Sequence, residues 1–190
     1  MEEFLNRIIP NIMNKLPIFY ESIRDTLIMV GWSGSISFVL GLILGVVLIV
    51  TKKGGILQNN FIYQVLDKVI NFFRSVPFII LLAALIPVTR KIMGTAIGVE
   101  GAIVPLIFGT VPFFARQIEA ALSEINPGLI EAAQSMGSGP IEIIFRVYLK
   151  EFVSGIARAT TITAISLIGL TAMAGAVGAG GLGDFAIRFG

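Results

Sequence analysis

The chain has 190 residues, of which 55% are hydrophobic and 14% charged, against about 25% charged in an ordinary soluble domain. A formal net charge of +2 provides no basic field of the kind that nucleic-acid binding requires. The absence of histidine and cysteine from the sequence excludes Ser-His-Asp and Cys-His nucleophiles, zinc sites of the usual ligand types and disulfides. These properties exclude most familiar hydrolytic and redox chemistry and indicate an all-α integral membrane protein.

Four apolar stretches predict helices that cross the membrane, because a bilayer core of about 30 Å needs about 20 apolar residues in a helix. The stretch before Arg90 is the shortest, at about 22 Å, and crosses only if its flanking turns contribute. Residues 1–24 precede the first stretch and are interpreted as an interfacial leader segment, which leaves 25–190 as the transmembrane domain. The four predicted spans are residues 26–50, 75–89, 92–115 and 159–183.

The only long polar stretch, residues 116–151, predicts a folded loop outside the membrane. Asn126 can cap a helix that has Pro127 at its first position, and Gly137 suits a left-handed C-terminal cap, which predicts a helix over 127–136. Gly139 and Pro140 then begin a second helix. Its apolar face is expected to hold Ile141, Ile144 and Tyr148.

Basic residues near span ends favour the cytoplasm. If the four spans alternate, the loop after the first span and the long polar loop fall on the same, cytoplasmic side, and the N-terminus lies outside. The basic residues on that side are Lys52, Lys53, Lys68, Arg74, Arg116, Arg146, Lys150 and Arg158.

Two short patterns resemble a catalytic and a nucleotide motif but fail on their context, and a third motif is absent. Gly31 to Gly34 has the form of an intramembrane serine protease motif, but no histidine is present to activate Ser33. Gly178, Gly180 and Gly183 match a dinucleotide fingerprint by letters, yet they lack the required strand, following helix and acid. There is no Gly-Lys dipeptide of a Walker-type loop, so any ATP hydrolysis must come from another chain.

Two polar features within the spans leave alternatives open. Glu100 is either an ion or proton site or an acid at the membrane interface. Thr160, Thr163 and Ser166, with Met173 further along, either line a polar pathway or bond their own and neighbouring helices.

The spacing within the long loop is specific. Glu131-Ala132-Ala133 is followed after three residues by Gly137, and after nine more by Val147-Tyr148-Leu149. This pattern resembles the EAA loop of ABC-importer permeases, from which it departs in Val147 for the usual isoleucine and in Lys150 for proline. Residues 74–78, 86–90 and 174–184 are similar to the methionine-uptake subgroup of that family.

The resemblance implies a multi-span helical bundle of the type I importer permease kind, usually with five spans, in the cell inner or plasma membrane. It implies a homodimer that forms the pathway, two ABC ATPase subunits that bind ATP and Mg²⁺, and an extracytoplasmic substrate-binding lipoprotein that delivers L- or D-methionine. The resemblance further implies that this chain is a non-catalytic permease subunit, not an enzyme, and that it holds no cofactor of its own. The residues expected to couple to the ATPase are Glu131, Ala132, Ala133, Met136 and Gly137.

Three other functions stay open on the sequence. One is a permease for another amino acid, one an ion-coupled secondary transporter that uses Glu100, and one a membrane scaffold whose helices pack through Gly41 and Gly45.

Overall fold

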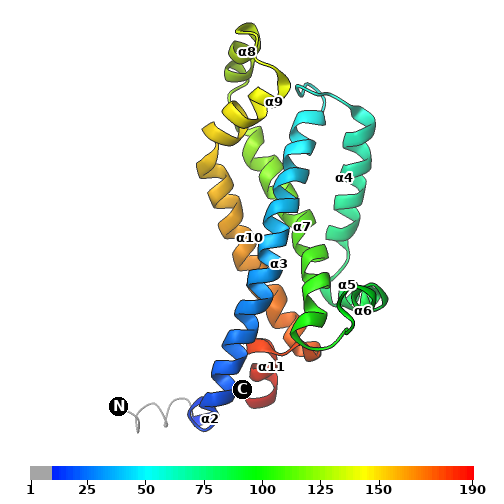
Figure 1. Ribbon diagram of the computed structural model, residues 1–190, viewed down its shortest axis with the longest axis vertical. Helices are drawn as coiled ribbons and strands as arrows, with labels where there is room; N and C mark the ends of the chain where they lie inside the picture. Colours follow the sequence, from blue (N-terminus) through cyan, green and yellow to red (C-terminus); the bar gives the residue numbers. More distant parts are fainter. Residues whose placement is uncertain (1–9) are drawn as a thin grey trace. The chain divides into compact units, whose positions relative to one another are not determined.

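A computed structural model of the protein describes residues 10–190, which form helices and loops without a strand (Figure 1). Residues 1–9 lie outside the described part, and with them the first part of the expected leader segment. The helices are α2 (Pro10–Met13), α3 (Leu16–Thr51), α4 (Asn60–Ser75), α5 (Phe78–Ala84), α6 (Ile86–Met93), α7 (Gly98–Ser123), α8 (Pro127–Ser135), α9 (Pro140–Ile143), η1 (Ile144–Leu149), α10 (Val153–Ala174), η2 (Gly175–Ala179) and α11 (Gly181–Phe189).

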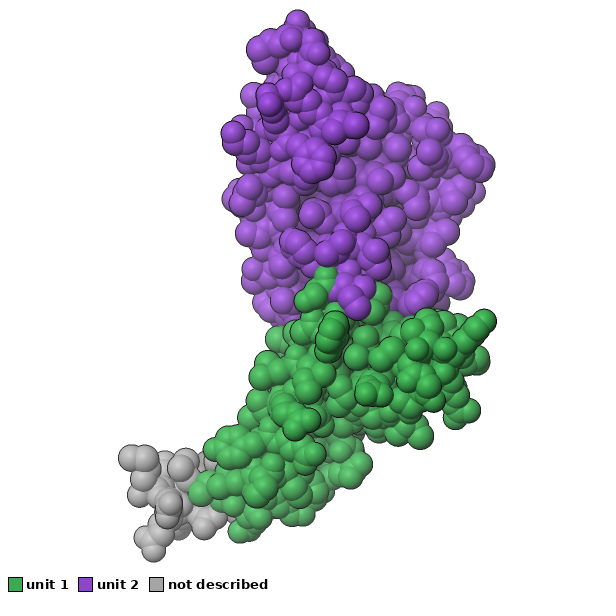
Figure 2. All heavy atoms as spheres, viewed as in Figure 1, with its two compact units in different colours: residues 1–35, 77–107, 166–190 green, residues 36–76, 108–165 purple. Residues whose placement is uncertain are grey.

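The chain divides into two compact units, coloured separately in Figure 2. Unit 1 holds the residues up to 35 together with 77–107 and 166–190. Unit 2 holds residues 36–76 and 108–165. Helices α3, α7 and α10 each continue from one unit into the other.

Three helices within the described residues are long and apolar enough to cross a membrane: Leu16–Thr51, Gly98–Ser123 and Val153–Ala179. They correspond to the first, third and fourth predicted spans, with shifted ends. The first begins at Leu16, so the later part of the expected leader segment, residues 16–24, is continuous with the span.

The second predicted span, residues 75–89, is wrong as a single crossing. The chain there forms α5 and α6, of 7 and 8 residues, which reach only about 11 and 12 Å each. Proline explains the division: Pro77 is the N-cap of α5, and Pro87 stands in the first turn of α6, where its missing N–H is tolerated.

Contacts among three helices of unit 2 establish their relative directions. A Cβ on Gly41 would meet Phe114, and one on Gly45 would meet Ile118, so α3 and α7 run in the same direction. In contrast, the Tyr63 hydroxyl of α4 donates a hydrogen bond to Glu119, while the ring of Phe73, ten residues later, contacts that of Phe108 in a tilted arrangement. Helix α4 is therefore antiparallel to both α3 and α7, and it leads the chain from the end of α3 back toward the level at which α7 begins.

The ends of α3 and α7 lie at the same end of unit 2, as Figure 1 shows. Ile56, after α3, and Ile130, after α7, pack on one apolar cluster. The loop after the first span and the long polar loop are thus on the same side, as expected. The buried members of this cluster are Ile49, Val50, Phe114, Ile118, Leu122, Ile125, Ala133, Ile143, Tyr148 and Ala159.

The boundary between the third span and the polar loop also differs from the prediction. Helix α7 continues to Ser123, so residues 116–123 are helical and the loop region begins after them. Arg116 is accommodated in the helix because its guanidinium pairs with Asp67 and Glu119.

In unit 1 the last span ends in a kink followed by a reversal of the chain. Gly178 and Gly180 have φ of 96° and 81°, which only glycine adopts readily. Helix α11 then packs back on η2: a Cβ on Gly175 would lie 2.7 Å from the Asp184 nitrogen. The glycine-rich end of the last span is therefore closely packed.

Candidate coupling site and relatives

The short helix α8 begins with the cap that the sequence predicts. The Asn126 side chain accepts a hydrogen bond from the Gly128 N–H at 2.9 Å, and Pro127 occupies the first helical position. The cap satisfies one of the N–H groups that the first turn leaves without a helical partner. Local sequence therefore fixes where α8 starts.

The same helix ends in a Schellman motif. The Ser138 N–H donates to the Ala133 carbonyl at 3.0 Å, and the Gly137 N–H donates to the Gln134 carbonyl at 2.9 Å. These are the two hydrogen bonds that define this cap. Gly137 has φ of 83°, as the motif requires. The predicted role of Gly137 as a left-handed cap is confirmed.

The second helix of the loop begins at Pro140, after Gly139, as predicted. It continues through η1, and Lys150 keeps helical angles of −78° and −44°. Lysine in place of the family's proline thus lets the helical backbone continue. Ile143 and Tyr148 are buried in the unit 2 cluster and hold this helix on the ends of α3 and α7.

Of the five residues expected to couple to an ATPase, four are exposed and one is not. Glu131, Ala132, Met136 and Gly137 are exposed, whereas Ala133 is buried at 6% exposure. The structure therefore places Ala133 as an anchor of α8. Ala133 lies three residues after the half-buried Ile130, so the two share a face of α8. This spacing was the signal in the sequence that Ala133 lies on the buried face.

The apolar face expected on the second helix divides in the structure. Tyr148 is buried and Ile144 is half-buried, but Ile141 is 72% exposed. Phe145, which the sequence analysis did not select, is 65% exposed, and Met136 of the preceding cap is 79% exposed. Three large apolar side chains of one short segment, which buried residues anchor, thus remain uncovered outside the spans.

The residues offered for a polar pathway lie along α10. The Thr160 and Thr163 hydroxyls donate to the Ile156 and Ala159 carbonyls, each at 2.8 Å, so both bond their own helix. Thr163 is buried, Thr160 and Ser166 are half-buried, and Met173 is exposed. Thr160 and Thr163 belong to unit 2, and Ser166 and Met173 to unit 1.

Glu100 lies in the first turn of α7 and is exposed. A carboxylate there is stabilised by the positive end of the helix dipole. This placement favours the interpretation as an acid at the end of the span.

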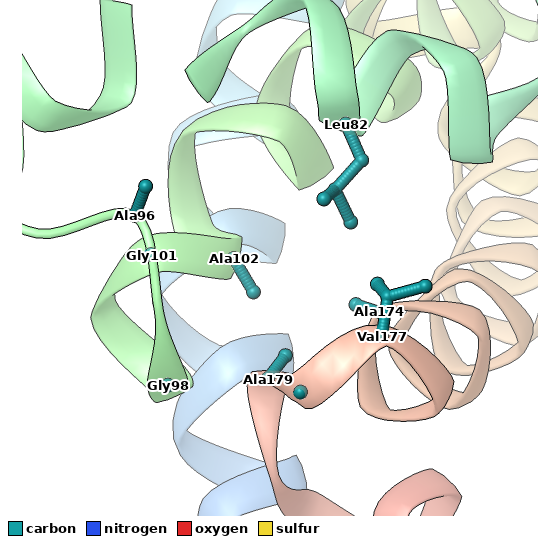
Figure 3. Close-up of a pocket in the computed structure, with 9 residues that line it drawn as sticks. Leu82, Ala96, Gly98, Gly101, Ala102, Ala174, Val177 and Ala179 are labelled. Atoms are coloured by element: carbon teal, nitrogen blue, oxygen red, sulfur yellow. The ribbon is translucent and has the colours of Figure 1, made fainter. Parts of the chain in front are cut away.

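A small pocket occurs in unit 1, where the side chains of Leu82, Ala102 and Val177 converge (Figure 3). Its cavity volume is about 20 Å³, far below the range of about 300–1,000 Å³ that is typical of small-molecule sites. None of its lining side chains carries a hydroxyl, an amide or a charge, so they cannot hold the ammonium and carboxylate of an amino acid. The lining residues are Leu82, Ala96, Gly98, Gly101, Ala102, Ala174, Val177, Gly178 and Ala179.

Comparison with known proteins decides the family. The family described as "Binding-protein-dependent transport system inner membrane component" matches residues 37–189. The match includes all of α8, α9 and η1, which together are called the coupling segment below. This chain belongs to that family. As a member, it is a multi-pass membrane protein and the permease subunit of an ABC importer.

Two relatives and one solved structure place it within the family. The probable D-methionine transport system permease protein MetI of Vibrio cholerae is 53% identical over 166 residues, which are 87% of this chain and 74% of the relative. The D-methionine transport system permease protein MetI of Yersinia pestis is 54% identical over 143 residues, 75% of this chain and 66% of that protein. A chain of the inward-facing MetNI methionine ABC transporter superimposes with a TM-score of 0.89 at 48% identity, covering 92% of this chain and 81% of that chain.

Proposed function

We propose that this chain is the translocation-pathway subunit of an ATP-driven importer of methionine, in its L- or D-form. The observation that carries the proposal is the segment from α8 to η1. It is held in place by buried anchors, yet exposes Met136, Ile141 and Phe145 outside the spans. A rigid helical segment with uncovered apolar side chains is suited to the groove of a partner protein.

The proposed partners of that segment are two ABC ATPase subunits, which bind ATP and Mg²⁺. Glu131, Ala132, Met136 and Gly137 would contact them, while Ala133 keeps α8 on the core. When ATP brings the two ATPases together, the coupling segments move with them, and the helices connected to those segments switch the pathway between its two openings.

The pathway itself is proposed to form between this chain and a second copy, with an extracytoplasmic lipoprotein delivering the substrate. Thr160, Thr163, Ser166 and Met173 of α10 are the proposed pathway positions. Methionine as the substrate is supported by the names of the relatives, and another amino acid is the principal alternative.

The decisive experiment is purification of the tagged chain in mild detergent, followed by identification of what accompanies it. We expect a stoichiometric ABC ATPase, and uptake of labelled methionine into proteoliposomes that contain the complex, ATP and the binding protein. A chain that purifies without an ATPase contradicts the proposal, as does uptake that follows a proton or sodium gradient and is lost in Glu100→Gln.

A matched pair of variants tests the contact. Met136→Glu places a charge on the coupling segment, while Ile187→Glu places the same charge at a similarly exposed isoleucine of α11. We expect Met136→Glu alone to release the ATPase. Equal retention of the ATPase by both variants would argue against the proposed surface.

A further inference from the structure

Arg116 of α7 makes a polar connection to α4 that the coupling proposal does not use. Its guanidinium pairs with the Asp67 carboxylate, and its Nη2 donates to the Asn71 Oδ1 at 3.3 Å. The Arg116 Nη1 lies 2.6 Å from the Glu119 Oε2, and the Tyr63 hydroxyl donates to the other oxygen of Glu119 at 3.3 Å.

The connection is shielded from solvent on its α7 side and is confined to one face of α4. The Arg116 and Glu119 side chains are 18% and 11% exposed, whereas the Asp67 side chain is 32% exposed. Tyr63, Asp67 and Asn71 follow each other at intervals of four residues, so they share a face of the helix. Ionisable groups in a helix that crosses a membrane are costly and are often functional.

Stability alone is a weak explanation for this cluster. A buried ion pair replaced by apolar residues of similar size is often as stable or more so, whereas a fork-shaped guanidinium fixes one register between two helices. Apolar packing of α4 on its neighbours consists of the Phe73–Phe108 ring contact and a small cluster in which Ile70 meets Leu48 and Ala115. The opposite face of α4 is apolar and exposed, with Phe61, Val65, Val69 and Phe72.

Helix α7 also leads directly to the coupling segment. Leu122 at its end and the following Ile125 share the buried cluster with Ala133 of α8 and Ile143 of α9. Packed side chains therefore connect α8 to the end of α7. Arg116 lies two helical turns before that end.

We propose that Arg116 is a positioning residue that makes α4 move together with α7 when the ATPase displaces the coupling segment. The inference rests on the proposed importer function. Without the guanidinium, α7 would follow the coupling segment while α4 would not, so ATP hydrolysis would continue with little transport.

The test uses the whole complex of permease, ATPase and binding protein in proteoliposomes, with methionine uptake and ATP hydrolysis measured on the same samples. Arg116→Met should lower the methionine moved per ATP hydrolysed by about tenfold, with ATP hydrolysis retained. The double variant Arg116→Asp with Asp67→Arg reverses the pair and should recover most of that ratio. Arg158→Met is the matched control, because it removes the same charge from an exposed pair with Glu124.

Distance measurement supplies a readout that does not depend on the substrate. Because the sequence has no cysteine, spin labels can be attached at cysteines introduced at Val69 of α4 and Ser123 of α7, both exposed. On ATP binding, we expect one narrow distance distribution in the parent protein and the reversed pair, and a broadened or shifted one in Arg116→Met.

Three results would overturn the inference: an unchanged ratio of transport to ATP hydrolysis in Arg116→Met, a fall of both activities in parallel with the folded fraction, or an unchanged label distance. Failure of the parent complex to take up methionine would instead refute the importer proposal. The label distances would still test whether Arg116 connects α4 to α7.

Discussion

Gly45 of α3 lies directly against Ile118 of α7. A Cβ built on Gly45 would lie 2.6 Å from the Ile118 Cβ and 2.8 Å from the backbone oxygen of Ala115. Helices in membranes associate through close packing of this kind, because lipid tails are as apolar as the side chains they would replace. The absence of a side chain at Gly45 therefore sets how closely α3 and α7 approach in unit 2.

Gly45→Ala should destabilise the protein by about 1–3 kcal/mol, since a backbone atom cannot move aside as a flexible side chain can. Gly31→Ala is the control on the same helix: nothing lies within 4 Å of its added methyl group, and alanine improves helix propensity by up to about 1 kcal/mol. Thermal unfolding in detergent should give a lower midpoint for Gly45→Ala only. Equal midpoints would refute close packing at Gly45.

Burial raises the pKa of the Tyr148 phenol above its ordinary value of 10.0. The unfolded phenol ionises first as the pH rises, so this residue's contribution to stability is fully present below about pH 10 and is lost as the pH passes through the folded pKa. Tyr148→Phe should match the parent at neutral pH and lose less stability above pH 10.

Denaturant midpoints measured across the alkaline range check this expectation for Tyr148. Tyr20→Phe, which removes an exposed phenol, is the control and should keep the parent's alkaline loss. A Tyr148→Phe profile that overlies the parent above pH 10 would show that burial of this phenol does not contribute.

Local signals in the sequence predicted the coupling segment in detail. Asn126 with Pro127 marked the start of α8, Gly137 its end, and Gly139 with Pro140 the start of α9. Each of these signals acts within a few residues, through a cap or a fixed backbone angle. They could therefore be recognised without knowing what packs against the segment.

The errors arose where distant residues decide the structure. Apolar composition made residues 75–89 look like a span, although Pro77 and Pro87 divide them. The charge of Arg116 led to the prediction that a polar loop starts there. In the fold Arg116 pairs with Asp67, 49 positions earlier in the chain, and this partner allows the helix to continue. Likewise, the burial of Ala133 depends on the ends of α3 and α7, and the EAA spacing alone does not reveal it.

Gly137→Val should uncouple ATP hydrolysis from uptake. Valine in the left-handed conformation of Gly137, φ 83°, costs about 1–2 kcal/mol, which would open the cap and turn Met136 and α9 away from their present directions. Asparagine tolerates this conformation better, so Gly137→Asn should keep more coupling.

Gly139→Val is the matched control for Gly137→Val. Both glycines have no atom within 4 Å of an added Cβ, but Gly139 has φ of −74°, which any residue adopts. Uptake and ATP hydrolysis, measured at equal expression, distinguish the Gly137→Val and Gly139→Val variants. Normal coupling in Gly137→Val would mean that the cap serves α8 alone.

Thr26 of α3 fixes the start of α11 in unit 1. Its hydroxyl oxygen accepts a hydrogen bond from the Leu182 N–H at 2.9 Å and donates to the Ser22 carbonyl at 2.9 Å. Thr26→Val removes the acceptor and leaves the Leu182 N–H without this partner, which costs about 1–3 kcal/mol. Hydrogen exchange of the α11 peptide should accelerate by about fivefold or more in Thr26→Val.

Thr161→Val, which removes an exposed hydroxyl that bonds only the Ala157 carbonyl of its own helix, should leave that rate unchanged. If both variants exchange at the parent's rate, α11 is held by the packing of Gly181 and Phe185 rather than by the Thr26 hydroxyl.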